Sequence, residues 1–121
     1  MRDFHQLDVW RRAHQLVVAV HRATDTRPRA PSGLTGQLRR AAMSIPTNIA
    51  EGCGHDTRRE YARFLAIASA SAVEVEYLLL LARDLGQLTA PECEALARET
   101  VAIRRMCRTL RHRILAESDD R

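Results

Sequence analysis

The 121-residue sequence contains no lysine, so all 19 of its Lys-or-Arg cations are arginines. The planar arginine fork suits phosphates and carboxylates, which favours an anionic partner. The codon preference of a GC-rich genome explains the same bias without any function, and both interpretations stay open. The formal net charge of +4 and the isoelectric point near 9.6 permit nucleic-acid binding without requiring it.

Aromatic residues and cysteines are also scarce. Aromatics make up 4% of the chain, whereas Ala, Leu, Arg and Glu dominate, a mixture that favours helices over sheets. The cysteines Cys53, Cys93 and Cys107 are odd in number and form no CxxC motif, which indicates a reducing environment. We find no apolar signal core at the N-terminus and no run of about 18 apolar residues. We therefore predict a cytoplasmic protein with no membrane partner.

Patterns typical of catalysis are missing as well. The five glycines are scattered singly, so they form no phosphate-binding loop, and no Ser or His falls into a nucleophile-elbow pattern. No Glu has a His three residues later, which excludes the ligand pairs of di-iron bundles. Glu51, Cys53 and His55 are possible metal ligands at alternate positions, but no second cluster completes the set, so a helix-ending loop is the preferred interpretation. The sequence predicts no enzyme, no metal and no cofactor.

Four segments with apolar residues at helical spacing are separated by proline and glycine breaks. The first break contains Pro28, Pro31 and Gly33, the second follows Gly52, and the third lies at Gly86. With these breaks the sequence predicts helices over 8–24, 33–52, 57–85 and 89–116. Short connections between amphipathic helices favour an all-α, up-down-up-down antiparallel four-helix bundle formed by a single domain, 1–121.

The ends and the interior of these segments carry further helix signals. Asp8 is a candidate N-cap, and Thr57 and Thr89 each have a Glu three residues later, as in a capping box. Pro46 interrupts the second segment, but its apolar spacing continues in phase, so we predict a kink and not a break. In the fourth segment a heptad seam is expected to pack against neighbouring helices. Its members are Leu96, Thr100, Ile103, Cys107, Leu110 and Ile114.

Several apolar residues lie off the main stripe of their helices, a pattern typical of contact with something outside the bundle. Self-association is the simplest explanation. The residues concerned are Trp10, Val18, Ile67, Leu80, Leu81 and Val101.

Arginines gather on the predicted second and fourth helices. Arg104, Arg108 and Arg111 share one helical face and are spaced to follow a line of phosphates. Arg105 and Arg113 flank that row, together with His112, and Arg39 and Arg40 form a smaller patch on the second helix. Rows of this kind are more often solvated faces or partners of Glu in ion pairs than binding surfaces. With so few aromatics to stack on bases, any nucleic-acid binding is expected to be backbone-driven and salt-dependent.

Three stretches of the sequence resemble a known family. They are 4–10 (FHQLDVW), 34–52 (LTGQLRRAAMSIPTNIAEG) and 64–71 (FLAIASAS), followed by Glu74. The chain is similar to the four-helix bundle family that includes the 23S rRNA intervening-sequence proteins and the accessory variability protein of diversity-generating retroelements. The resemblance implies a homopentameric ring. In the retroelement members it also implies a reverse transcriptase partner and a basic surface that binds nucleic acid.

The resemblance supplies no catalytic residues. Its signature positions Asn48, Glu51 and Gly52 are present, and we predict a structural role for them in preference to ligand binding. Asn48 and Glu51 share a helix face and can bond a neighbouring helix or subunit. Two functions follow as hypotheses. One is a non-enzymatic, oligomeric accessory factor that binds RNA or DNA. The alternative is a protein–protein interaction scaffold or adaptor with no nucleic-acid binding.

Overall fold

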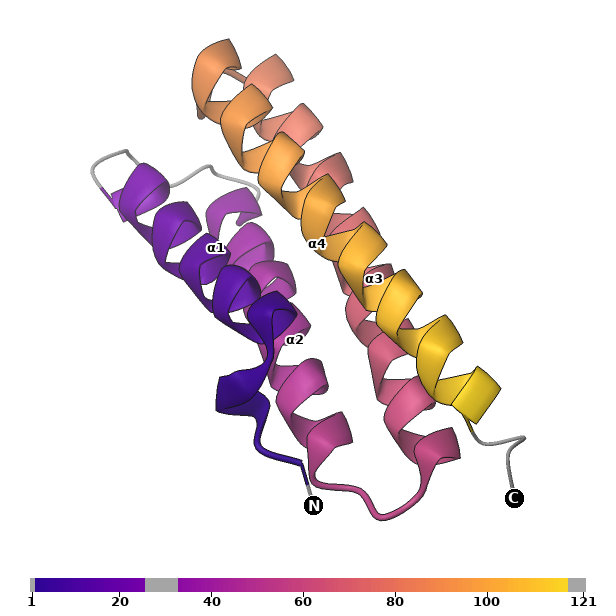
Figure 1. Cartoon of the computed structure of the whole chain (residues 1–121). Coiled ribbons are helices and arrows are strands. Elements are labelled where there is room, and N and C mark those ends of the chain that lie inside the picture. The colour runs from indigo at the N-terminus through magenta and orange to yellow at the C-terminus, as the bar shows by residue number, and fades with distance from the viewer. Residues whose placement is uncertain (1, 26–32, 118–121) are drawn as a thin grey trace.

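The computed structural model describes residues 2–25 and 33–117, and this part of the chain is almost entirely helical with no strand. A short 3-10 helix, η1, precedes the four α-helices (Figure 1). Each end of the four helices lies within one residue of the end predicted from the sequence. The elements are η1 (Phe4–Gln6), α1 (Asp8–Asp25), α2 (Leu34–Cys53), α3 (Arg58–Asp84) and α4 (Ala90–Glu117).

Consecutive helices run antiparallel and lie side by side, and α1 also packs against α4, which closes the bundle (Figure 1). This arrangement confirms the predicted all-α, up-down-up-down bundle. Helices α3 and α4 have 27 and 28 residues, so each is about 40 Å long at 1.5 Å per residue. Helices α1 and α2 have only 18 and 20 residues. The α3–α4 hairpin therefore extends beyond its partners at the end that carries the α3–α4 turn (Figure 1).

The helix starts follow the predicted caps with two differences. At α4 the capping box is complete, because the Glu92 amide donates to Thr89 Oγ1 and the Thr89 amide donates to Glu92 Oε1. At α3 the Glu60 amide donates to the Thr57 hydroxyl, but the Glu60 carboxylate pairs with Arg63 instead of closing the box. Asp8 is the first residue of α1 and not its cap, and its carboxylate pairs with Arg11.

Helix α2 continues without a break through the buried Pro46, as predicted, and the kink expected there stays a prediction. Near its C-terminal end it approaches α3 so closely that only glycine fits at position 52. A Cβ atom built on Gly52 would lie 2.9 Å from Tyr61 Cδ1 and 3.0 Å from Phe64 Cβ. The glycine of the signature therefore permits the tight packing at the α2–α3 corner.

The core runs along the whole interface between the helices. The seam of α4 points inward, with Thr100, Ile103, Cys107 and Ile114 buried and Leu96 and Leu110 partly buried. All three cysteines are buried. Burial raises the pKa of the Cys107 thiol to about 12 and also raises the pKa of Cys53. The thiols of Cys53 and Cys107 are therefore poorly ionised, and these residues act as small hydrophobes of the core.

Helix α3 contradicts the prediction that no segment of the chain is apolar enough to span a membrane. By length and composition it is apolar enough to cross a membrane, although the sequence was expected to contain no such run. In the bundle this helix packs against both α2 and α4, and its buried face supplies residues from Tyr61 to Ala82 to the core. Core helices of bundles pass the same test, so α3 is weak support for a membrane contact.

Candidate nucleic-acid interface

Arg104 belongs to the joint between α3 and α4. Its Nε donates to Glu76 Oε2 at 2.7 Å, and less than a third of either side chain is exposed. A partly buried, hydrogen-bonded ion pair holds its arginine in a fixed place. Arg104 therefore holds α4 against α3, and its charge is already matched within the bundle.

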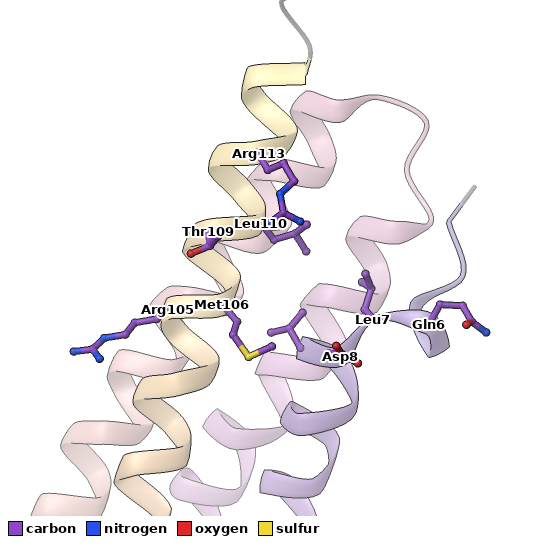
Figure 2. Close-up of a pocket in the computed structure, with 9 residues that line it drawn as sticks. Gln6, Leu7, Asp8, Arg105, Met106, Thr109, Leu110 and Arg113 are labelled. Carbon is purple, nitrogen blue, oxygen red and sulfur yellow. The ribbon is translucent and has the colours of Figure 1, made fainter.

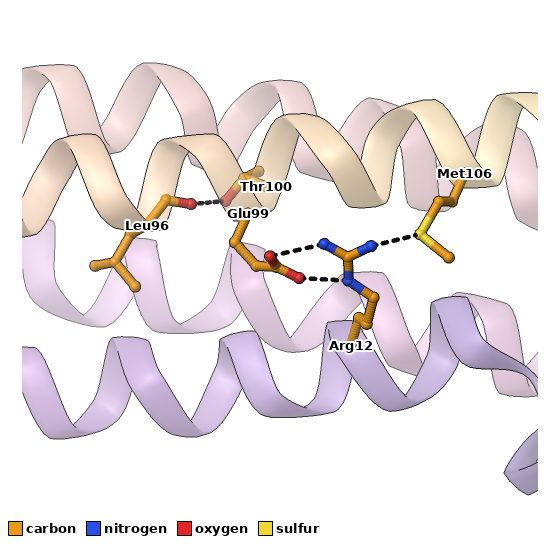
Figure 3. A network of polar contacts seen from close by, with 5 residues as sticks. All are labelled: Arg12, Leu96, Glu99, Thr100 and Met106. Atoms are coloured by element: carbon orange, nitrogen blue, oxygen red, sulfur yellow. Dashed lines mark hydrogen bonds and ion pairs between the residues drawn. The ribbon is translucent and has the colours of Figure 1, made fainter.

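A second matched arginine lies on the opposite side of α4. Arg12 of α1 donates from Nε and Nη2 to the two oxygens of Glu99, at 2.7 and 2.9 Å, and from Nη1 to the Met106 sulfur (Figure 3). These hydrogen bonds lower the pKa of Glu99 and raise the pKa of Arg12. This two-pronged contact fastens α1 to α4 and leaves little of either charge for a partner.

The outward face of α4 carries a different set of cations. Arg98, Arg105 and Arg108 are exposed, and so is His112. Arg98, Arg105 and His112 are seven residues apart, so they recur on one line that extends about 21 Å along the helix. Within the part of the chain that the structure describes, no carboxylate forms an ion pair with Arg98, Arg105 or Arg108. We call Arg98, Arg105, Arg108 and His112 the α4 row.

Arg113 lies beside a groove where the start of α1 meets the end of α4. The groove holds about 450 Å³ and has an apolar floor that includes Leu7, Met106 and Leu110. Arg105 and Arg113 both line it, with Arg105 directed away from α1 and Arg113 lying near Leu110 (Figure 2). The predicted cations on this side thus frame an apolar groove instead of continuing the straight line of the α4 row.

The two arginines predicted on α2 have separate surroundings. Arg39 is half-buried and donates from Nε to Thr24 Oγ1 at 2.8 Å, while its Nη2 lies 3.9 Å from Asp25 Oδ1. These contacts tie the end of α1 to the start of α2. Arg40 is exposed. Of these two arginines, Arg40 is therefore the one whose charge is exposed to solvent.

Of the two polar signature residues, Asn48 is linked to the α2–α3 contact, whereas Glu51 faces solvent. Asn48 Nδ2 donates to the carbonyl and the hydroxyl oxygens of Ser44 on its own helix, and the Ser44 hydroxyl in turn contacts the Ser71 hydroxyl at 2.8 Å. The hydrogen bonds of Asn48 thus reach α3 through Ser44. Glu51 is exposed and lines a shallow apolar hollow between α1 and α2.

The three candidate metal ligands do not come together. The Cys53 side chain is buried against Tyr61, with Sγ 3.8 Å from the phenol oxygen, and the His55 ring stacks on Phe64. Glu51 faces solvent. Among the residues that the structure describes, no group of three or more His, Cys, Asp or Glu side chains is arranged to hold a metal ion.

An apolar stripe lies on the outer face of α3. Val73, Tyr77 and Leu80 expose 54%, 58% and 44% of their surface, and Ala66 and Ala70 continue the same line. The sequence-based list of outward apolar residues included Leu80 but missed Val73 and Tyr77. We call Ala66, Ala70, Val73, Tyr77 and Leu80 the α3 stripe.

Sequence reasoning also missed Arg98, and the signal for it was available. The heptad seam of α4 defines an inward face, so cations seven residues apart on the opposite face must point outward together. The row predicted from spacing alone, through Arg104, Arg108 and Arg111, lies nearer the α3 boundary. One of its members, Arg104, is matched there by Glu76.

The comparisons with known proteins agree with this architecture. The family model described as 23S rRNA-intervening sequence protein matches residues 5–109 of the chain. The chain belongs to this family. A solved structure, a protein of unknown function from the S23 ribosomal protein family of Bacteroides thetaiotaomicron VPI-5482, superposes with a TM-score of 0.77 at 21% identity. The match covers 84% of this chain and 96% of that one, and it supports the shared fold. No curated protein matches the sequence.

Proposed function

We propose that this member of the 23S rRNA-intervening sequence protein family is a non-enzymatic, self-associating accessory protein that binds the phosphate backbone of nucleic acid. The single observation that carries the proposal is the α4 row. It brings three exposed arginines and a histidine onto the outward face of α4, and the three arginines have no acidic partner in the described part of the chain. Cations that no carboxylate neutralises are the ones that can release counterions from a phosphate backbone.

The chemistry of the row favours backbone contacts over base recognition. The α4 row has no Phe, Tyr or Trp side chain, and the exposed Tyr77 lies on α3. Binding is therefore expected to be weakly sequence-specific and to fall steeply with salt. The name of the family refers to sequences that intervene in 23S rRNA, which makes RNA the first nucleic acid to test.

Self-association is the second part of the proposal. The α3 stripe exposes apolar surface along several turns of one helix, and a second copy of the chain is the partner that we propose for it. The resemblance suggests a pentameric ring, in which five rows would act together and raise the local positive potential. Changing Val73 and Tyr77 to Glu should lower the particle mass measured by light scattering, whereas Gln37→Glu, an exposed change on α2, should not.

The test of the proposed function is a salt titration. Affinity for a structured RNA and for DNA of equal length is measured between about 50 and 200 mM salt, and the logarithm of the binding constant should fall linearly with the logarithm of salt. The slope counts the phosphates engaged. Absence of binding to either nucleic acid at low salt would overturn the proposal.

The α3 stripe favours a second candidate function, a protein–protein scaffold. That function needs the exposed apolar residues but not the α4 row. It would be preferred if the chain failed to bind nucleic acid, and if loss of Val73 and Tyr77 abolished capture of a protein partner.

A further inference from the structure

A small polar hollow lies between α3 and α4, apart from the groove beside α1. It holds about 230 Å³, less than the 300–1,000 Å³ or so of pockets for drug-sized ligands, so it suits a small group. Four of its five lining residues have polar or cationic side chains, and none is acidic. The lining consists of Ala66, Ser69, Arg108, Arg111 and His112.

Arg111 brings an unmatched donor to this hollow. Its Nε is buried, and it has no hydrogen-bond partner within the described residues. A buried donor without a partner destabilises the folded chain, and more so when the group is charged. An acceptor that enters the hollow would offset part of that destabilisation.

The register of the two helices explains why no carboxylate of α3 pairs with Arg111. One heptad away, Arg104 of α4 is held by Glu76 of α3 at 2.7 Å. In an antiparallel pair, moving seven residues forward on α4, to Arg111, corresponds to moving seven residues back on α3, to Ser69. Ser69 therefore stands where a glutamate would pair with Arg111, and it brings a short hydroxyl in place of a carboxylate.

We propose that this hollow binds a phosphate group. Arg108 and Arg111 supply two guanidinium groups, the Ser69 hydroxyl supplies a neutral donor, and the His112 ring supplies a further polar group. Phosphate presents several acceptor oxygens at once, so it matches a set of several donors on two helices. A phosphodiester of bound nucleic acid and free inorganic phosphate share this chemistry, and in the first case the inference rests on the proposed function.

The test uses the full chain with two probes, inorganic phosphate and a structured RNA. Binding is followed by NMR shifts of the Ser69, Arg108 and Arg111 amides. Ser69→Glu should pair internally with Arg111, as Glu76 does with Arg104, and should remove both the phosphate-induced shifts and part of the RNA affinity. Gln37→Glu makes the same change in net charge on an exposed position of α2 and should leave both unchanged.

Ser69→Ala keeps the inference testable if the glutamate variant does not fold. Loss of the hydroxyl should weaken phosphate binding by about tenfold. If phosphate shifts none of these amides and RNA affinity is the same in both Ser69 variants, the hollow is not a phosphate site, although RNA binding itself would leave the proposed function standing. Phosphate shifts without any RNA binding would support the hollow as a small-anion site and overturn the proposed function.

Discussion

Two arginines at the helix–helix contacts of α4 are paired with carboxylates, whereas three arginines on its outer face are not paired with any carboxylate among the described residues. Toward α1, the guanidinium of Arg12 is held by both oxygens of Glu99, and toward α3 Arg104 is held by Glu76. On the outer face, Arg98, Arg105 and Arg108 make no ion pair within the described residues. The comparison teaches that the net charge of the chain is a poor guide to its binding surface. What matters is which cations the fold has already matched.

The largest effect is expected from charge reversal of the three arginines in the α4 row. Replacing Arg98, Arg105 and Arg108 by Glu should lower affinity for RNA about a hundredfold at low salt, since three phosphate contacts are lost and three repulsive charges are added. Fluorescence anisotropy at 50 mM salt measures the change. An affinity within threefold of the wild type would mean that the α4 row does not carry binding.

The next largest effect is expected on the stability of the bundle, with no change in its affinity for RNA. Gly52→Ala should lower the free energy of unfolding by about 1–3 kcal/mol, because the new methyl group would lie 2.9 Å from Tyr61 Cδ1. Urea unfolding measures it. Gly54→Ala is the matched control, since its Cβ would meet only the Glu51 carbonyl oxygen, at 3.4 Å. RNA affinity of the folded Gly52 variant should be unchanged, and equal stability of the two variants would contradict the close-packing account.

The smallest effect is expected at the ion pair between Arg12 and Glu99. Glu99→Gln should lower stability by less than about 1 kcal/mol at pH 7, since over a third of each partner's side chain is exposed to solvent. Arg12 depresses the pKa of Glu99 below its usual 4.5, so this contribution is complete above about pH 4.5 and is lost as the pH falls through the depressed value.

Urea unfolding of wild type and Glu99→Gln at pH 7 and pH 3 checks this dependence. The difference in stability between the two proteins should shrink at the lower pH. A difference that stays constant would show that the carboxylate charge contributes nothing to the α1–α4 joint.

The fold could be predicted from the sequence because its signals are local. Heptad spacing on α4, the Thr–Glu caps and the isolated glycines each act within a few residues, and they located every helix end within one residue. The partners of the arginines could not be predicted in this way. Whether Arg104 meets Glu76, or Arg111 meets Ser69, depends on the register between two helices, which no pattern within a single helix determines.

The α3 stripe shows the same limit. Val73 and Tyr77 lie in a helix whose apolar residues are mostly buried, so the composition of the helix gave no signal that these two are exposed. Only the positions of α2 and α4 on either side of α3 leave that face uncovered. The Gly52 signature was recognised as structural, but its reason, contact with Tyr61 and Phe64, also lies between helices.

The central claim is that open arginines, and not total charge, carry binding. It is tested most directly by two variants with the same change in net charge, Arg105→Gln with Arg108→Gln and Arg12→Gln with Arg104→Gln. Their RNA affinity is measured against salt, well below the unfolding temperature. The first pair should reduce the slope of log affinity against log salt by about 1.4–1.8, for two lost contacts. The second pair should leave the slope unchanged. Equal reductions in both would contradict the account.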